Sequence, residues 1–326
     1  MNRISIIVPI YKVEKYIKRC CDSLFTQSSD NIEYLFVDDA SPDDSVRILE
    51  QEISAHNIPK DKVRLIRNEV NNGVAYTRQV GLENATGEYV LFVDADDWID
   101  STCIDKLLKI IKNSEVDIVG YNWYLEFCQG RRVLEQAVCK DGNEAFIAML
   151  SGGLRWYLWS FLIKRSLFVS NNIQFIPGWN VGEDMMVLVK LFSRLPTFYQ
   201  INEPLYHYNQ ENMASITRMK AGNQISIVAN HVNEVEAYIR DKYDSRYNKE
   251  INFLKLNVKF PLLITKDVQC YQLWSNYFRE SDKAIWGNRY ITTRSKVLQW
   301  VASHRLYGMV KFYNVAFDFI YKLLYK

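Results

Sequence analysis

The sequence predicts an α/β fold, with a mostly parallel sheet flanked by helices and a helical region at the C-terminal end. Short β-branched or aromatic runs alternate with amphipathic helical patterns through the first third of the chain. Strands buried on both faces read as nearly continuous apolar runs, and their alternation with helices is typical of right-handed βαβ units. The 326 residues suffice for one large or two modest domains.

The strands of this sheet are expected at residues 4–9, 32–37, 63–66 and 89–93, where the apolar runs lie. The helical spacing of one buried face recurs between them at 13–25 and 46–53, and again at 104–111. Ligands of such sheets bind beyond the carboxyl ends of the strands, where loops lead into helices. The loops after these strands are therefore the first place to look for chemistry.

The pattern changes after residue 115. Residues 117–127 and 131–138 read as extended segments on either side of Gln129-Gly130, which predicts an antiparallel excursion. Helices are expected at 143–150 and 183–195, a strand at 198–208, and helices from about 221 onward. We place a soft boundary near 215–220, which separates residues 1–217 from a helical region at 218–326.

Composition excludes several classes of protein. Forty Lys and Arg against 38 Asp and Glu give a net charge of +2, which is not the basic signature of a nucleic-acid-binding domain. The six cysteines form no C-x-x-C pair, so we expect a reduced, cytosolic chain without a zinc site or disulfide framework. The apolar run at the N-terminus is too short for a signal peptide, and no stretch is long and apolar enough to span a membrane.

Carboxylates gather where two of the predicted strands end. The second strand ends in Asp38-Asp39, and the fourth ends in Asp94-Ala95-Asp96-Asp97. Acids at these positions can simply cap the next helix, but three carboxylates within four residues repel one another unless a cation or donor is present. Two carboxylates together with substrate phosphate oxygens are a usual way to hold Mg²⁺ or Mn²⁺.

Two further motifs carry charged residues at helix starts. Gly73 permits a tight turn before a helix that carries Arg78, whose guanidinium could bind phosphate or pair with a neighbouring carboxylate. Glu183 and Asp184 follow Gly182 at the start of an apolar helix. The helix dipole lowers the pKa of such acids, and a carboxylate that stays ionised at neutral pH suits a general base.

The ordered motifs resemble those of an inverting family-2 glycosyltransferase with the GT-A fold, of the kind that builds bacterial surface polysaccharides. The resemblance covers roughly residues 3–215 and rests on five separated motifs in the family's order: Pro9-Ile10-Tyr11, Asp38-Asp39-Ala40-Ser41, Asn72-Gly73 with Arg78, Asp94-Ala95-Asp96-Asp97 and Gly182-Glu183-Asp184. It implies a Rossmann-like nucleotide-binding half at 1–115 and an acceptor half at 116–217. Phe161, Gln79 and Ala40 depart from residues common in relatives, which weakens any transfer of acceptor specificity.

The resemblance also implies roles for individual residues. Asp184 would be the catalytic base with Glu183 beside it in the acceptor site, and Asp96 would be the principal ligand of Mn²⁺ or Mg²⁺, with Asp94 near the ribose and the metal. Arg78 would reach the phosphates or base of the nucleotide. The remaining donor-binding positions would be Pro9, Tyr11, Asp38, Asp39 and Ala95.

The function that this implies is transfer of a sugar from a nucleotide-sugar donor, with UDP expected by family habit. The acceptor would be a saccharide or a lipid-linked saccharide, and the activity a hexosyl or N-acetylhexosaminyl transfer in cell-envelope polysaccharide biosynthesis. A metal-dependent nucleotidyltransferase and an inactive nucleotide-sugar-binding relative are the alternatives. The first lacks support because no Gly-rich phosphate loop follows the first strand, and the second because Asp96 and Asp184 are intact.

Several weaker candidates have ordinary structural alternatives. His207 could contact a metal or diphosphate, although a lone histidine is more often a structural residue. Trp159 could stack on an acceptor sugar, although core packing is the more common role of such a residue. The other candidates are Asp97, Ser215 and Arg218.

Residues 294–326 carry six basic residues against one acidic residue and are rich in aromatics. Met309, Phe312 and Ala316 fall on one helical face. A basic, aromatic amphipathic helix suits in-plane attachment to anionic lipid, and the alternative is a helix packed on the catalytic domain. We therefore expect a cytoplasmic protein that can lie peripherally on the inner face of the cytoplasmic membrane.

Overall fold

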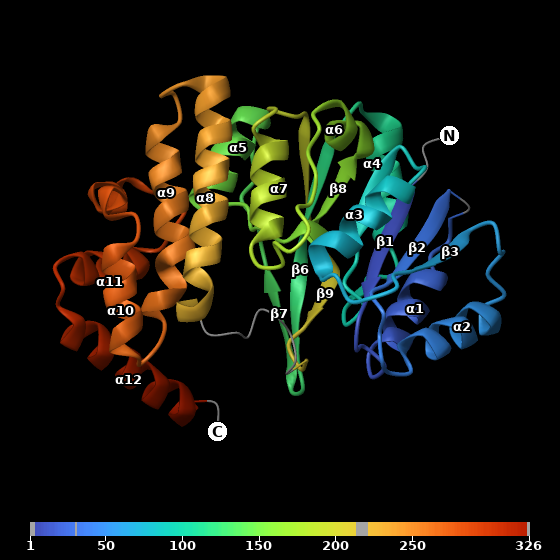
Figure 1. Ribbon diagram of the computed structural model, residues 1–326, viewed down its shortest axis with the longest axis horizontal. Helices are drawn as coiled ribbons and strands as arrows, with labels where there is room; N and C mark the ends of the chain where they lie inside the picture. Colours follow the sequence, from blue (N-terminus) through green and yellow to red (C-terminus); the bar gives the residue numbers. More distant parts are fainter. Residues whose placement is uncertain (1–3, 30, 213–220, 325–326) are drawn as a thin grey trace. The chain divides into compact units, whose positions relative to one another are not determined.

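The computed structural model describes residues 4–29, 31–212 and 221–324 (Figure 1). The chain divides into two compact units. The first takes in Met1–Ala145 and Trp156–Ala214, and the second takes in Phe146–Arg155 and Ser215–Lys326.

The sheet of the first unit begins with four parallel strands in the order β3-β2-β1-β4. Their bounds are Ile4–Ile10 for β1, Ile32–Asp38 for β2, Val63–Arg67 for β3 and Tyr89–Phe92 for β4. Each lies within one residue of its predicted end. The predicted βαβ units are therefore confirmed.

The rest of this sheet is mixed. The order continues β8-β6-β9-β5, with β7 paired to β6, and the bounds are Phe161–Lys164 for β8, Ile118–Phe127 for β6, Phe198–Asn209 for β9, Trp98–Ile99 for β5 and Gly130–Leu134 for β7. The β6–β7 hairpin is the antiparallel excursion that the sequence predicted. The α/β fold is confirmed, although β4–β8, β6–β8 and β5–β9 also pair antiparallel.

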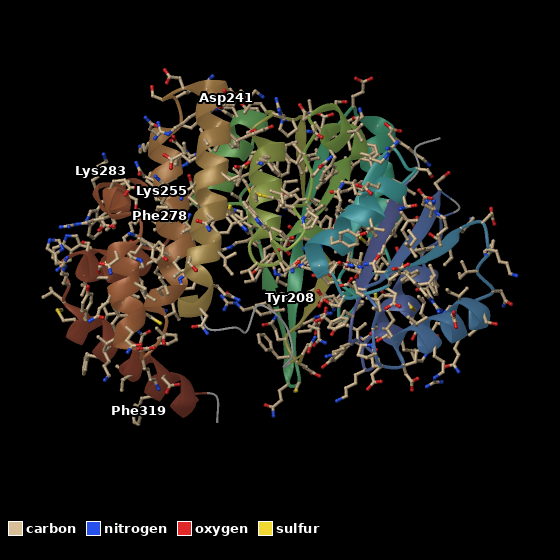
Figure 2. The ribbon with its side chains drawn as sticks, viewed as in Figure 1. Tyr208, Asp241, Lys255, Phe278, Lys283 and Phe319 are labelled. Atoms are coloured by element: carbon tan, nitrogen blue, oxygen red, sulfur yellow. The ribbon has the colours of Figure 1, made fainter. Side chains whose placement is uncertain are left out.

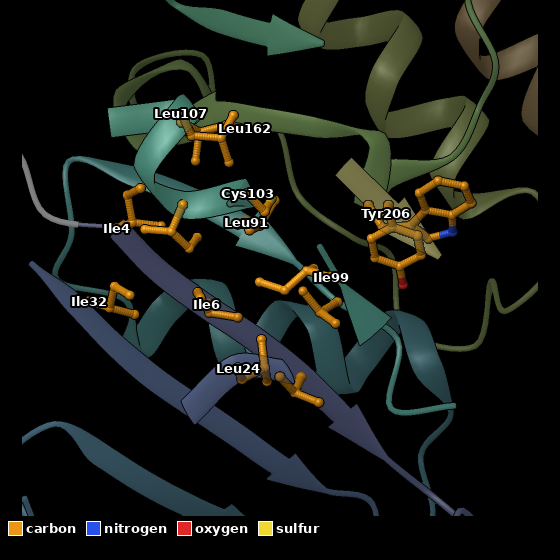
Figure 3. Close-up of a cluster of buried hydrophobic side chains, with 14 of the residues drawn as sticks. Ile4, Ile6, Leu24, Ile32, Leu91, Ile99, Cys103, Leu107, Leu162 and Tyr206 are labelled. Atoms are coloured by element: carbon orange, nitrogen blue, oxygen red, sulfur yellow. The ribbon is translucent and has the colours of Figure 1, made fainter. Parts of the chain in front are cut away.

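Alternation along β1 explains why helices cover both faces of the sheet. Ile4 and Ile6 lie in a buried cluster with residues of α1 (Ile17–Phe25) and α4 (Cys103–Asn113), as Figure 3 shows. Ile7 points to the opposite face, because a Cβ added to Gly81 of α3 (Val74–Asn84) would lie 2.3 Å from its Cγ2. Helix α2 (Ser45–Ala55) adds the buried Leu49 to the first cluster.

The remaining helices of the first unit are short. They are α6 (Arg165–Ser170) and the buried α7 (Glu183–Phe192), while α5 (Gly142–Ser151) contributes to both units. The helix predicted to end at Leu195 ends three residues earlier, and the backbone of Leu195 has a φ of +52°. Neither the short strand β8 nor the 3₁₀ turn at Leu158–Ser160 was predicted from the sequence.

The described part of the second unit is helical, as predicted from residue 221. It contains α8 (Ala221–Tyr243), α9 (Asn248–Lys259), α10 (Val268–Asn276), α11 (Thr293–Ser303) and α12 (Tyr307–Leu324), with 3₁₀ turns at Phe260–Leu263 and Arg279–Gly287. Its own buried core includes Leu256, Tyr271, Trp274 and Val310. Side chains cap two helix starts: Asp267 accepts from the amide of Gln269, and Thr292 from that of Ser295.

Candidate active site

The loops after β1 and β2 are tied together at one edge of the sheet. The amide of Asp39 donates to the carbonyl oxygen of Ile10 (2.9 Å), and Asp38 Oδ1 accepts from the amide of Ser41 (2.9 Å). Burial raises the pKa of Asp38. Pro9 is half-buried and Tyr11 is 41% exposed, so the phenol ring is accessible at this edge.

Asp39 braces the loop that precedes α3. Its carboxylate accepts from the Asn68 side chain (2.8 Å) and from the amides of Asn72 (3.0 Å) and Gly73 (2.7 Å), and the residue is 3% exposed. The resemblance placed Asp39 beside the nucleotide base. In the structure its hydrogen bonds set the Asn72-Gly73 turn, and the place beside the nucleotide base stays a prediction.

Gly73 is required where it stands for two reasons. Its φ is +86°, and a Cβ built there would lie 2.2 Å from the side-chain amide of Asn180. Asn180 Oδ1 accepts from the amide of Ala75 (3.1 Å) and so satisfies an N–H in the first turn of α3. Sequence reasoning did not find Asn180; its place three residues before Glu183 was the available signal.

Arg78 lies at the centre of the carboxylate cluster. Its Nη2 donates to Asp94 Oδ1 (2.9 Å), and its Nη1 donates to Glu183 Oε1 (2.8 Å) and Asp184 Oδ1 (2.5 Å). The side chains of Asp94, Asp184 and Glu183 are 28%, 18% and 10% exposed, whereas that of Arg78 is 5% exposed. The cation therefore lies behind the carboxylates that it binds.

In the structure Arg78 binds carboxylates, and the nucleotide contact that the resemblance implies stays a prediction. Its guanidinium forms ion pairs with Asp94, Glu183 and Asp184, which is the carboxylate pairing that the sequence also allowed. Burial disfavours the charged guanidinium, but Asp184, Asp94 and Glu183 together raise the pKa of Arg78 well above its usual range. The guanidinium is held as a permanent cation between the end of β4 and the start of α7.

Glu183 and Asp184 begin α7, where Gly182 has a φ of +80°. Asp184 Oδ2 accepts from the amide of Leu158 (3.2 Å). Burial raises the pKa of Asp184, and burial together with repulsion by Asp184 raises the pKa of Glu183 to about 7. The helix-dipole argument predicted lowered pKa values; it is outweighed because both carboxyl groups are largely removed from water.

Asp96 and Asp97 are adjacent but differ in exposure and in hydrogen-bond partners. Asp96 Oδ2 accepts from the side chain of Asn212 (2.8 Å), and burial, reinforced by the charge of Asp94, raises the pKa of Asp96 to about 6. Asp97 is 1% exposed and accepts from the Tyr206 hydroxyl and the Asn209 amide, each at 2.8 Å. Asp97 therefore fastens β9 to this turn, while Asp96 stays partly accessible.

Ala95, between the carboxylates, is 3% exposed and packs in the hydrophobic core of the first unit. The donor-side role that the resemblance gave to this position stays a prediction.

His207 is packed between aromatic rings. It stacks on Trp98 (centroids 5.0 Å apart) and Tyr124 (4.8 Å), and its Nδ1 lies 2.7 Å from Glu126 Oε1. Burial lowers the pKa of His207. These contacts fit the structural alternative for His207, and its role at a metal stays a prediction.

A cluster of possible metal ligands lies elsewhere in the described residues, at Asp22, Glu52 and His56. The Lys18 ammonium already bridges Asp22 (3.3 Å) and Glu52 (3.0 Å) there. A metal that also binds substrate phosphates needs only one or two protein carboxylates. The turn after β4 therefore remains the better candidate, although it offers fewer protein ligands.

Of the remaining candidates, Trp159 packs in the core, and two others lie outside the described residues. Trp159 is 2% exposed and stacks on Tyr206 (4.2 Å) and Tyr157 (4.8 Å), which is core packing. Ser215 and Arg218 fall outside the residues that the structure describes.

Residues 5–172 match the sequence model of the family described as Glycosyl transferase family 2. The chain is 30% identical over 226 residues to the uncharacterized glycosyltransferase EpsJ of Bacillus subtilis. That match covers 66% of this chain and 63% of the relative, so it spans less than two thirds of the relative's length.

Solved structures share the fold. The crystal structure of Staphylococcus aureus TarS 1–349 in complex with UDP-GlcNAc superposes with a TM-score of 0.70 at 20% identity, over 97% of this chain and 91% of that one. The mannosyltransferase PcManGT of Pyrobaculum calidifontis, in complex with GDP-Man and Mn²⁺, gives 0.52 at 16% identity, over 93% and 86%. These likenesses confirm the GT-A fold.

Proposed function

Because this chain belongs to glycosyltransferase family 2, we propose that it transfers a sugar from a nucleotide-sugar donor to a saccharide acceptor in polysaccharide biosynthesis. One observation carries the proposal. Arg78 joins Asp94, on the expected donor side, to Asp184, on the expected acceptor side, through a single guanidinium. The carboxylates of two motifs that lie far apart in sequence thus meet in one site.

Asp184 is the proposed general base. Its carboxylate takes the proton of an acceptor hydroxyl as the hydroxyl oxygen attacks the anomeric carbon from the face opposite the nucleotide. The bond from that carbon to the diphosphate breaks, the nucleoside diphosphate leaves with the electron pair, and the configuration inverts. At 18% exposure, the Asp184 side chain is accessible enough to meet an acceptor.

Asp96 and Asp94 would hold a divalent cation, Mn²⁺ or Mg²⁺. The donor set fits, because both offer the carboxylate oxygens that these ions prefer. The cluster also fits in charge, since its carboxylates outnumber the guanidinium of Arg78; burial, followed by the charge of a neighbouring carboxylate, raises the pKa of Asp96 and of Glu183. When bound, such an ion supplies neutralisation of charge on the departing diphosphate.

The donor that we propose is a UDP-sugar carrying a hexose or N-acetylhexosamine. Support comes from TarS, a poly(ribitol-phosphate) β-N-acetylglucosaminyltransferase that is 27% identical to this chain over 212 residues and was solved with UDP-GlcNAc. Tyr11 and Asp38 lie at the sheet edge where the resemblance places the nucleotide base.

The decisive experiment measures binding and transfer with a panel of nucleotide sugars in Mn²⁺ or Mg²⁺. The variant Asp184→Asn should keep donor affinity and lose transfer by about 10²- to 10⁴-fold, the usual contribution of a positioned base. Glu203→Gln, at a carboxylate whose side chain is 60% exposed, is the matched control. Substantial turnover by Asp184→Asn would remove it as the base.

The same assay separates the alternative function. A glycosyltransferase releases a nucleoside diphosphate, whereas a nucleotidyltransferase releases pyrophosphate. Release of pyrophosphate would therefore contradict the proposal, and absence of binding to every nucleotide sugar would overturn it.

We also propose attachment to a membrane surface, from the exposed apolar face of α12. Val310 is fully buried in the core of the second unit, whereas the apolar side chains on the other face of the helix are exposed. Figure 2 labels Phe319 on this helix. The exposed residues and their exposed fractions are Met309 at 58%, Phe312 at 75%, Val315 at 45% and Phe319 at 66%.

The occupant that this face fits is an anionic lipid bilayer. Arg305 and Lys311 are exposed beside the apolar residues, and Arg294 lies over the ring of Phe317 (4.3 Å). Apolar side chains flanked by cations suit the boundary between headgroups and acyl chains. No helix of the described residues is long and apolar enough to cross a bilayer. A lipid-linked acceptor and a place on the inner face of the cytoplasmic membrane follow as parts of this proposal.

Flotation with vesicles tests it. The full chain should float with phosphatidylglycerol vesicles and much less with phosphatidylcholine vesicles, and Phe312→Glu with Phe319→Glu should abolish flotation. Val169→Glu, at another exposed apolar residue (65%), is the control. Flotation of the double variant equal to that of the wild type would overturn the proposal. So would a wild-type chain that binds no vesicles but forms a dimer that the double variant loses.

A further inference from the structure

We propose that Arg78 is a positioning residue that holds Asp184 and Asp94 in one fixed arrangement and does not itself bind the donor. The inference rests on the proposed function, since it requires Asp184 to act as the base. It differs from the role that the family resemblance implies for this arginine, and the difference can be measured.

The first support for a positioning role is the difference in exposure between Arg78 and the carboxylates that it binds. The Arg78 side chain is 5% exposed, against 28% for Asp94 and 18% for Asp184. A donor or acceptor that enters the site therefore meets the carboxylates before the guanidinium. Movement of Arg78 toward a phosphate would leave three largely buried carboxylates without their cation, and uncompensated buried charge is strongly unfavourable.

The second support is the geometry of the two hydrogen bonds that Asp184 accepts. Asp184 is held at both oxygens, with Arg78 Nη1 donating to Oδ1 and the amide of Leu158 donating to Oδ2. Two donors on different oxygens fix the plane of the carboxylate. A carboxylate has about four acceptor positions, so each oxygen keeps capacity for an acceptor hydroxyl. The base is thereby oriented and remains able to accept a proton.

The placement of Arg78 follows from the turn before its helix. Asp39 binds the amides of Asn72 and Gly73, and Asn180 binds the amide of Ala75. These bonds fix the residue at which α3 begins. Arg78, five positions after Gly73, therefore lies on a defined turn and face of the helix. The start of α3, and with it the backbone position of Arg78, is set by contacts that do not involve Asp94, Glu183 or Asp184.

The test compares Arg78→Lys and Arg78→Met with wild type in the full chain. We expect Arg78→Met to lower kcat by about 100-fold, the cost of a misplacement of about 1 Å, with donor KM and Kd changed less than about threefold. Arg78→Lys, which keeps a cation, should recover part of kcat and remains informative if Arg78→Met does not fold. Arg240→Met, at a partly exposed arginine paired with Glu236 in the second unit, is the control.

A double variant shows whether Arg78 acts through the base. Adding Arg78→Lys to Asp184→Asn should lower transfer little further, because the positioned group is already lost. Independent, multiplicative losses would overturn the inference. So would a rise of tenfold or more in donor Kd with kcat unchanged, which would return Arg78 to the donor site while leaving the proposed function intact. Wild-type protein that binds no nucleotide sugar would overturn the proposed function, and this inference with it.

Discussion

Each of the two units holds a cluster of charged side chains around buried cations, and the two clusters are built differently. In the first unit, Arg78 faces Asp94, Glu183 and Asp184, with Asp96 and Asp97 in the same turn as Asp94; we call this the site cluster. In the second unit, the lysine cluster consists of Lys255 with Glu236 (2.7 Å) and Glu280 (2.8 Å), and Lys259 with Asp282 (2.8 Å); Figure 2 labels Lys255.

The pKa values of the carboxylates move in opposite directions in the two clusters. Burial acts to raise the pKa of Glu236 and Glu280, but hydrogen bonds from Lys255 hold both below their usual range. In the site cluster, burial raises the pKa of Asp96 and Glu183 to about 6 and about 7. Arg240 also pairs with Glu236 (2.8 Å), so the three carboxylates of the lysine cluster face three cations. A cluster balanced in this way supports the fold, whereas the excess of carboxylates in the site cluster keeps negative potential available for a ligand.

The largest effect on stability should come from Lys259→Met. Lys259 is fully buried and also contacts the carbonyl oxygen of Tyr277 (3.0 Å) and the ring of Trp274 (4.0 Å). Its loss leaves Asp282 largely unpaired, which should lower the free energy of unfolding by about 3 to 5 kcal/mol in urea titrations. The exposed Lys283→Met is the control, and a loss under about 1 kcal/mol would show that the lysine cluster is not structural.

Glu183→Gln should raise the free energy of unfolding, by less than Lys259→Met lowers it. The folded pKa of Glu183, about 7, exceeds the unfolded value of about 4.3, so the ionised group costs stability increasingly as pH rises between these values. Gln should therefore stabilise the protein by about 2 to 4 kcal/mol at pH 8 and by little at pH 4. Urea midpoints at the two pH values check this. Equal effects at both would contradict a carboxyl group short of cations.

Of these three substitutions, Tyr206→Phe should change the free energy of unfolding least. The Tyr206 hydroxyl donates to Asp97 (2.8 Å) and accepts from the amide of Asp94 (3.1 Å), while its ring stacks on Trp159. Phenylalanine keeps the stacking and loses both hydrogen bonds, for a loss of about 1 to 2 kcal/mol in the free energy of unfolding. Tyr199→Phe, at an exposed ring, is the comparison, and equal losses would show that the Asp97 contact contributes nothing.

Much of the first unit could be predicted because its signals are local. Strands buried on both faces, such as β4, read as apolar runs, and parallel strands place their carboxyl ends at one edge, which brought Asp38 and Asp94 to the same side. Short elements such as β8 are set by tertiary pairing, which four residues cannot encode on their own.

The partners of the site residues could not be predicted for a different reason. Arg78 and Asp184 are 106 positions apart, and which group the guanidinium meets depends on how α3 and α7 pack. The same holds for Asn209 and Asn212, which β9 and its continuation bring to the turn after β4. Residue type indicated that these positions belong to a functional site. Which side chain each of them binds is decided by tertiary contacts alone.

The close approach of Gly73 and Asn180 has an evolutionary consequence. The two positions fit each other sterically, but the dependence is unequal. Asn180 can give way to a smaller residue at the cost of one hydrogen bond to Ala75, whereas the φ of +86° at Gly73 disfavours any side chain even when residue 180 is small. Diverging descendants of this chain should therefore exchange Asn180 long before they exchange Gly73.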